Sequence, residues 1–312
     1  MQNYEPKSPL LSPRYADIST FSRLPHTQDL RKVNLVIVGI PYDGGTTFRP
    51  GARFGPRGIR QASCMNRNVH PIHQLNIYEK LSPIDYGDIP CNPLSFLKTQ
   101  KIIEKSYTDF LKQKIIPIGL GGDHSVLLPI LRTFKKYYGR FGLIQFDAHT
   151  DTADQAWGEK YHHGTPVRRL IEEGVLKGSD IYQIGIRGPL TSKDQLAWDQ
   201  KQGILHLTIE AYNQKGFKPF IKKINSNIPY YLSFDIDGVD PAFAPGTGTP
   251  VVGGLTSYQA LECVRSLHQL RFIGFDVVEV APIYDHAEIT TLLASALVFE
   301  FMSLAAATST TK

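Results

Sequence analysis

The chain has 312 residues, of which 42% are hydrophobic and 20% are charged, with a formal net charge of +5. This composition is typical of a globular protein, and the modest, scattered positive charge argues against a nucleic-acid-binding protein. We find no apolar run near the roughly 18 residues that a membrane span needs, and no basic-then-apolar leader at the N-terminus. Three cysteines without a Cys-x-x-Cys pair support neither a disulfide framework nor a zinc knuckle. The sequence therefore predicts a cytoplasmic protein that does not associate with a membrane.

A polar arm precedes alternating strands and helices. Residues 1–32 are rich in Pro, Ser and polar groups and are predicted to be an N-terminal arm, whereas residues 33–312 form one domain. Short apolar runs predict strands over 34–40, 115–120, 141–145, 181–187, 204–207, 229–237 and 272–280. Helical spacing of apolar residues predicts helices from near Pro56 and over 93–114, 126–138, 166–173, 217–225, 257–267 and 289–306. The alternation predicts a parallel sheet with helices on both faces and ligands at the carboxyl ends of its strands.

Acidic and histidine residues follow three of the predicted strands. His124 follows the second strand, and Ser125 is the expected N-cap of the next helix. Side chains at positions i, i+2 and i+4 of an extended backbone point the same way. The spacing therefore predicts that Asp147, His149 and Asp151 converge after the third strand, and that Asp235 and Asp237 do so after the sixth.

These six residues have the composition of a metal site. Four carboxylates and two imidazoles are too many ligands for one tetrahedral zinc ion and suit two metal ions that share bridging carboxylates. An oxygen-rich set with some nitrogen favours Mn²⁺, with Fe, Co or Ni as alternatives. Without metal, so many acids in one place would repel each other.

Three motifs in this order resemble the ureohydrolase family of arginases and agmatinases. They are Gly121-Gly122-Asp123-His124-Ser125, Asp147-Ala148-His149-Thr150-Asp151 and Ser233-Phe234-Asp235-Ile236-Asp237-Gly238-Val239-Asp240-Pro241. The segments 44–56, 245–250 and 278–282 are typical of the agmatinase branch. The resemblance covers nearly the whole chain, from about Tyr15 to Ala306.

The resemblance implies a three-layer αβα fold with a mainly parallel eight-stranded sheet, two Mn²⁺ ions per subunit and a homo-oligomer, either a hexamer or a trimer. It assigns His124, Asp147, Asp151 and Asp235 to one metal ion, and Asp147, His149, Asp235 and Asp237 to the other. The catalytic residues that it implies are His163 as a proton shuttle, Asp151, which stabilises the intermediate and passes the proton on, and Glu279, which binds the guanidinium group in a bidentate contact that accepts two N–H bonds. Asp123, Asp240 and Asp276 are assigned to supporting or turn positions.

Agmatinase activity, which gives putrescine and urea and belongs to polyamine metabolism, is the activity we expect. The alternatives are hydrolysis of 4-guanidinobutanoate, 3-guanidinopropanoate or guanidine, and a non-catalytic protein that keeps the metals only to hold its fold. An ammonium tail would require an acidic or carbonyl rim, and a carboxylate tail would require an arginine. The loops supply both charges, with Arg49, Arg53, Arg57 and Arg187 against Asp154, Glu159 and Asp285. Arginase activity is disfavoured because the residues between Asp151 and His163 do not resemble the arginase loop that binds the amino-acid end of the substrate. An amide hydrolase with a single zinc ion is disfavoured because six ligands are too many for one such ion.

Overall fold

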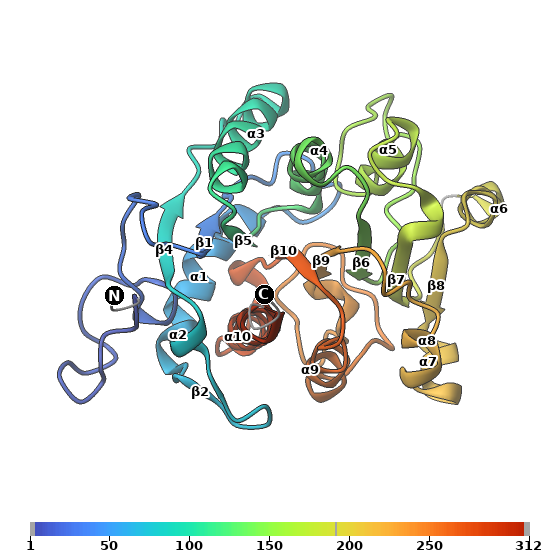
Figure 1. The fold of residues 1–312 in the computed structure, drawn as a ribbon. Coiled ribbons are helices and arrows are strands. Elements are labelled where there is room, and N and C mark those ends of the chain that lie inside the picture. The colour runs from blue at the N-terminus through green and yellow to red at the C-terminus, as the bar shows by residue number, and fades with distance from the viewer. Residues whose placement is uncertain (1–3, 191, 309–312) are drawn as a thin grey trace.

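An eight-stranded parallel sheet runs through the molecule (Figure 1). The computed structural model describes residues 4–190 and 192–308. The strand order is β4-β1-β5-β10-β9-β6-β7-β8, and each neighbouring pair is parallel. The strands are β1 (Leu35–Gly39), β4 (Pro83–Asp88), β5 (Ile116–Leu120), β6 (Gly142–Phe146), β7 (Ile181–Ile186), β8 (Leu205–Thr208), β9 (Tyr230–Asp235) and β10 (Phe272–Val278).

Helices cover both faces of this sheet. In the view of Figure 1, α3 (Phe96–Lys112), α4 (Leu127–Tyr138) and α5 (Pro166–Glu172) lie above it. Below it lie α1 (Gly55–Ala62), α9 (Ser257–Arg265) and α10 (Ile289–Thr308). The remaining helices are α2 (Ile77–Lys80), α6 (Lys193–Gln202), α7 (Ile209–Lys215) and α8 (Lys218–Ile221). The fold is the three-layer αβα architecture that the resemblance implied.

Each face of the sheet has its own apolar core. On one face Phe134 of α4 packs edge-on against Tyr231 of β9, with ring centroids 5.1 Å apart. On the other, Phe275 of β10 stacks on Phe301 of α10, also at 5.1 Å. Strands that are buried on both faces have continuous apolar sequences, which is why the pattern predicted these strands well.

The helix α10 is more apolar than the sequence analysis expected. Its segment Ile289–Ala307 is long and apolar enough to pass a length-and-composition test for a membrane span, contrary to our statement that the chain has no such run. However, 78% of the apolar window is buried inside the protein. Because it packs against the sheet and against α1 and α9, α10 is a core helix of the fold.

The pattern missed the edge strand β4 and several short elements. The sequence of β4, Pro-Ile-Asp-Tyr-Gly-Asp, begins with proline and contains two acids, so it lacks the apolar run of an inner strand. The N-terminal arm covers it, because the Phe21 backbone N–H donates to Asp85 Oδ2 at 2.7 Å and His26 forms a parallel bridge with Asp85. Residues 4–32 therefore protect this sheet edge, as an exposed edge requires. The short hairpin of β2 (Val69–His70) and β3 (Leu75–Asn76), and the helices α2, α6 and α7, were also missed.

Candidate metal centre and active site

His124 lies just beyond β5, in a short 3₁₀ helix (His124–Val126) that continues into α4. The N-cap of this helix is Asp123, whose side chain accepts the backbone N–H of Ser125 at 2.9 Å. The prediction that Ser125 is the N-cap is therefore wrong. The preceding Gly122 is required sterically, because a Cβ atom there would lie 1.6 Å from the carbonyl oxygen of Tyr42. The backbone at Gly122 thus packs closely against that of Tyr42, which fixes the position of the His124 side chain.

Hydrogen bonds fix the orientation of the His124 ring. Ser233 Oγ donates to Asp276 Oδ1 at 2.6 Å and is 2.9 Å from His124 Nε2. Since the serine proton is engaged with the carboxylate, the serine oxygen accepts from Nε2–H, which leaves the lone pair on Nδ1. Nδ1 is buried and has no hydrogen-bond partner among the described residues. This is the tautomer that a metal-ligating histidine needs.

The loop after β6 brings Asp147, His149 and Asp151 to the same region, but not by extended geometry. The strand ends at Phe146, and Asp151 has a positive φ of 54°, so the i, i+2, i+4 argument is wrong for these residues. The loop is shaped by hydrogen bonds instead, because the His149 N–H donates to Asp147 Oδ1 at 2.7 Å and Gln145 donates to Asp147 Oδ2 at 2.7 Å.

Asp235 and Asp237 are also brought together by a turn. The strand β9 ends at Asp235, two residues earlier than predicted, and a 3₁₀ helix (Ile236–Gly238) follows. Asp235 Oδ1 accepts the N–H of Asp237 at 2.9 Å. Arg187 holds this turn from outside, because its guanidinium donates to the carbonyl oxygen of Asp237 at 2.7 Å and that of Gly238 at 3.1 Å. Arg187 therefore stabilises the backbone of this turn and is not one of the charged residues at the rim of the cavity.

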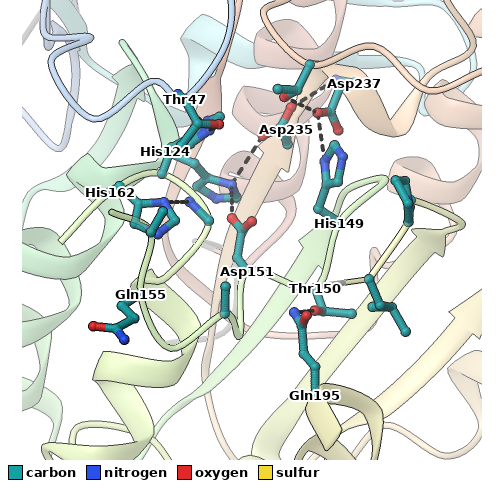
Figure 2. A pocket seen from close by; sticks show the side chains of 18 of the residues that line it. Thr47, His124, His149, Thr150, Asp151, Gln155, His162, Gln195, Asp235 and Asp237 are labelled. Carbon is teal, nitrogen blue, oxygen red and sulfur yellow. Dashed lines mark hydrogen bonds and ion pairs between the residues drawn. The ribbon is translucent and has the colours of Figure 1, made fainter. Parts of the chain in front are cut away.

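The six predicted ligands converge in two groups. Figure 2 shows five of them at the cavity: His124, His149, Asp151, Asp235 and Asp237. Nδ1 of His124 lies 2.9 Å from Asp151 Oδ2 and 3.2 Å from both Asp147 Oδ2 and Asp235 Oδ2. Nδ1 of His149 lies 3.1 Å from Asp237 Oδ2 and 3.6 Å from Asp147 Oδ1. Asp147 presents one oxygen to each group, which is the position of a bridging ligand.

The charges of these groups fit a pair of divalent cations. Burial and the neighbouring Asp237 and Asp147 carboxylates raise the pKa of Asp235 well above its ordinary value. Burial alone would lower the pKa of His149, but the Asp237 carboxylate outweighs it and raises the pKa to about 12. Both shifts show that negative charge is concentrated here, and divalent metal ions held by carboxylate and imidazole ligands would neutralise it.

His163 and Glu279 form a second, adjoining pair. Nδ1 of His163 lies 2.9 Å from Glu279 Oε1, and Nε2 lies 2.7 Å from Thr47 Oγ1. Burial lowers the pKa of His163, but the charge and hydrogen bond of Glu279 outweigh it and raise the pKa to about 9. Glu279 Oε1 also accepts the His124 N–H at 2.8 Å, while its Oε2 has no partner among the described residues. One oxygen of Glu279 therefore lacks a partner, although it is shielded from solvent and Glu279 is not among the described residues that line the cavity.

A cavity of about 440 Å³ opens at this edge of the sheet. His124, Asp151, Asp235 and Asp237 line its inner end, together with His149 and His163. Its wall comes mainly from the loops after β6 and β7, with additions from α6 and from the segment between β9 and α9. It includes neutral residues that the sequence analysis did not single out: Thr150, Gln155, Ala156, Trp157, His162, Pro189, Leu190, Gln195 and Thr249. Burial and the neighbouring charge of His163 lower the pKa of His162 to about 4, so this wall residue is neutral too. Among the described lining residues, the wall has no lysine, arginine or carboxylate.

The charged loop residues that we expected at the rim have other partners. Arg53 pairs with Asp43, Arg169 donates to Asp154 at 2.7 Å, and Asp285 accepts the N–H groups of Thr290 and Thr291 at the start of α10. Arg49 lies over the rings of Phe48 and Tyr284. None of them lines the cavity, and neither do the exposed Arg57 and Glu159.

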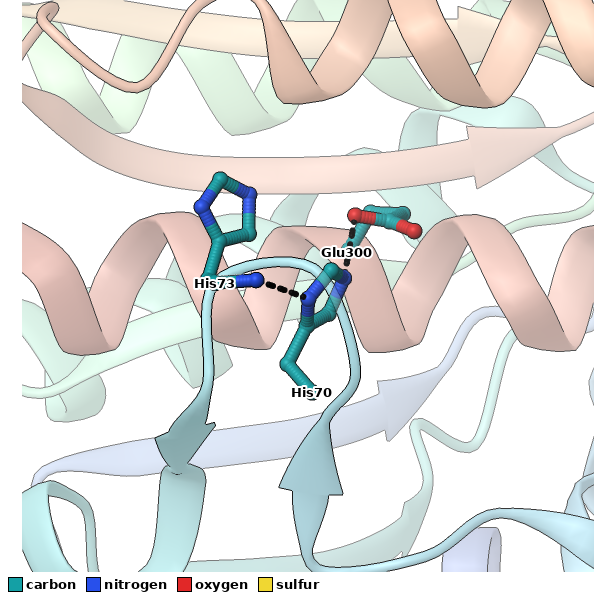
Figure 3. Close-up of side chains that lie close together, drawn as sticks. All are labelled: His70, His73 and Glu300. Atoms are coloured by element: carbon teal, nitrogen blue, oxygen red, sulfur yellow. Dashed lines mark hydrogen bonds and ion pairs between the residues drawn. The ribbon is translucent and has the colours of Figure 1, made fainter.

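A separate group of His70, His73 and Glu300 lies between the β2–β3 hairpin and α10 (Figure 3). The His73 N–H donates to His70 Nδ1 at 3.1 Å, so His70 Nε2 carries the proton and donates to Glu300 Oε2 at 2.8 Å. Arg265 occupies the other oxygen of Glu300 at 2.7 Å. Both nitrogens of His70 and both oxygens of Glu300 are engaged, so this group fastens the β2–β3 hairpin to α10.

Comparison with known proteins agrees with this geometry. The sequence model of the arginase family matches residues 33–304. This chain belongs to the arginase family. It is 42% identical to guanidinobutyrase of Pseudomonas aeruginosa, with 93% of each protein covered. It is 41% identical to mitochondrial agmatinase of Gallus gallus, over 93% of this chain and 86% of that protein.

The fold of this arginase-family chain also matches solved structures. Proclavaminate amidinohydrolase from Streptomyces clavuligerus matches with a TM-score of 0.91 and 39% identity, covering 95% of this chain and 99% of that one. The predicted family and fold class are thus confirmed. Relatives with different names occur at similar identity, so the comparison does not distinguish between substrates.

Proposed function

We propose that this chain, a guanidino hydrolase of the arginase family, converts agmatine and water to putrescine and urea. The observation that carries the choice of agmatine is the charge of the cavity. Its inner end is lined by carboxylates, and its described wall has no lysine or arginine. Because the bound metal ions would neutralise the carboxylates, the wall is the part of the cavity that contacts the tail, and a carboxylate tail would find no cationic partner there.

Two divalent metal ions, manganese in our proposal, would be held by His124, Asp147, His149, Asp151, Asp235 and Asp237. When bound, they supply Lewis acidity that lowers the pKa of water and generates a strong nucleophile near neutral pH. The chemistry needs this, because the resonance-stabilised guanidinium carbon is a reluctant electrophile. The three carboxylate oxygens around Nδ1 of His124 and the shared position of Asp147 support this assignment.

His163 is proposed to carry the proton that the departing amine needs. Glu279 raises the pKa of the ring to about 9, and Nε2 lies at the cavity, where it accepts the Thr47 N–H at 3.2 Å and would take up a proton when that bond is released. The amine is a poor leaving group until it is protonated, so an imidazolium at this position suits general acid catalysis. Asp151 is proposed to stabilise the intermediate and to assist in the proton transfer.

Glu279 is proposed to bind the guanidinium through Oε2, the oxygen that lacks a partner among the described residues, and to stabilise the protonated form of His163. Its Oε1 already accepts from His124 and His163, so the bidentate guanidinium contact expected from the sequence would require one of these bonds to be released. The carboxylate is 1% exposed, and a buried, partly unsatisfied carboxylate favours a cationic partner.

Guanidino acids are the second candidate class, because guanidinobutyrase is as similar to this chain as agmatinase is. The deciding experiment measures urea release by the manganese-loaded and the nickel-loaded protein. The substrates are agmatine, 4-guanidinobutanoate, 3-guanidinopropanoate, arginine and guanidine. We expect agmatine to give the highest kcat/KM. A higher value for a guanidino acid would replace the proposed substrate, and no urea from any of them with two metals bound would favour the non-catalytic alternative.

The proton-transfer role has its own test. His163→Ala should retain both metal ions and lose urea release by about 10²–10⁴-fold, which is the usual contribution of a general acid. The matched control is His162→Ala, because His162 precedes His163 but makes no contact with Glu279. Similar losses in both variants would remove the special role of His163.

A further inference from the structure

A second polar cavity lies between the N-terminal arm and the turn that follows α1. It has a volume of about 150 Å³, and we call it the arm cavity. Lys7, Arg14 and Arg23 of the arm line it, together with Asn66 and Arg67 of the turn and the carboxylate of Glu5. None of these residues lines the cavity at the metal centre. Four cationic side chains around one small cavity have no role in the chemistry described above.

Two of these arginines present buried N–H groups that lack partners. Nη1 and Nη2 of Arg23 and Nε of Arg14 are shielded from solvent and have no hydrogen-bond partner among the described residues. The side chain of Arg23 is only 9% exposed. A guanidinium does not lose its proton in a protein, so it cannot escape the cost of burial by becoming neutral. An unsatisfied buried charge of this kind requires an anionic partner.

The nearby carboxylates do not fill this requirement. Asp17 Oδ2 lies 3.9 Å from Arg23 Nη2, which is too far for a hydrogen bond, and it already accepts from Lys7 Nζ at 2.5 Å and Ser12 Oγ at 2.8 Å. Glu5 lines the cavity but has no ion pair with any of the described residues. Lys7, Arg14, Arg23 and Arg67 contribute four positive charges. Glu5 in the cavity and Asp17 beside Arg23 contribute two negative charges, which leaves a net charge of +2.

The direction of Arg23 is set by the fold of the arm. Ser22 and Arg23 both have positive φ, 51° and 61°, an unfavourable conformation for residues with side chains. It is held by two hydrogen bonds to the body of the protein, from the Ser22 N–H to Ser63 Oγ at 2.7 Å and from Asn66 Nδ2 to Ser22 Oγ at 2.9 Å. The structure therefore maintains a strained backbone that directs the guanidinium into the cavity.

We propose that the arm cavity binds a small oxyanion, held mainly by Arg23 and Arg14. The same chemistry is offered by a tetrahedral anion of the phosphate or sulfate type and by a carboxylate of a small dicarboxylic acid, since either accepts several guanidinium N–H bonds. Because Arg14 belongs to the arm and Arg67 to the body, the bound anion ties the arm to the body. This site is independent of the proposed function.

The test uses the full-length, metal-loaded protein, with sulfate and malonate as separate probes at an ionic strength held constant with chloride. Sulfate replaces phosphate because it binds metal ions more weakly, and the cavity variants below show how much of either probe, malonate included, binds at the metal centre instead. We expect saturable binding in calorimetry and a rise in Tm of about 2–5 °C at saturation. Tighter binding of sulfate identifies a tetrahedral anion as the natural ligand class, and tighter binding of malonate identifies a carboxylate.

The variants are Arg23→Gln and Arg14→Gln, and the matched control is Arg31→Gln, an exposed arm arginine that pairs with Asp29 outside the cavity. We expect each cavity variant to weaken binding at least about tenfold, and the control to bind as the wild type does. Arg14→Gln keeps the test valid if Arg23→Gln does not fold. The proposal is overturned if the wild type binds neither probe saturably, or if both cavity variants bind unchanged. It is also overturned if Arg23→Gln dissociates an oligomer that neither anion affects, since the arginine would then pair with a second copy of the chain.

Discussion

The inner end and the wall of the main cavity are built from different parts of the chain. The proposed metal ligands at the inner end lie at or shortly after the ends of β5, β6 and β9, and all of them except His149 are buried. The wall consists of longer loops whose side chains are neutral and partly exposed, such as Gln155 and Trp157. The ends of the central strands therefore carry the proposed metal ligands, and we expect the loops to select the substrate.

The largest expected effect is at the inner end. Asp147→Ala removes a carboxylate that presents one oxygen to each ligand group, so both metal ions should bind far more weakly. Urea release should fall by at least about a thousandfold, because metal ions contribute several kcal/mol to the transition state. Metal content is measured by elemental analysis beside activity. Asp154→Ala, on the same loop but paired with Arg169, is the control, and two retained metal ions in Asp147→Ala would refute the bridging position.

A smaller effect is expected where the two regions meet, at Glu279. The carboxylate raises the pKa of His163 to about 9, so the protonated acid persists up to that pH and is lost as pH rises through it. In Glu279→Gln the charge is gone while burial still lowers the pKa, so the alkaline limb of kcat should move to lower pH. The same variant should raise KM for the guanidinium substrate. An alkaline limb that stays in place would show that the limb belongs to another group.

The smallest effect is expected in the wall. Gln155→Lys and Gln155→Glu place opposite charges at one exposed lining position without touching the metal ligands. Exposed charge pairs contribute up to about 1 kcal/mol, so the ratio of kcat/KM for agmatine to that for 4-guanidinobutanoate should change roughly fivefold. It should fall in the lysine variant and rise in the glutamate variant. Equal ratios in both would mean that the tail does not lie along this part of the wall.

The same division explains how much could be predicted from the sequence. The inner strands and all six proposed ligands were identified, because buried strands have distinctive apolar runs and the ligands follow them directly. The reason given for their convergence was wrong, since turns rather than extended strands bring Asp151 and Asp237 into place. The partners of Arg187 and Asp285 could not be predicted, because a charged residue in a loop has the same sequence pattern whether it faces a cavity or caps a backbone.

The strand order links metal binding to the completion of folding. The strand β10 lies between β5 and β9, so His124 meets Ser233, 109 positions away, and Glu279, 155 positions away, only when the central strands are paired. Such distant pairings form slowly, because the chain between them must first be ordered. A partly folded chain therefore lacks a complete ligand set, and the ions stabilise the native state selectively by mass action. Chelation should accordingly lower Tm, which makes the metal content of a preparation a measure of how much of the chain has reached its final topology.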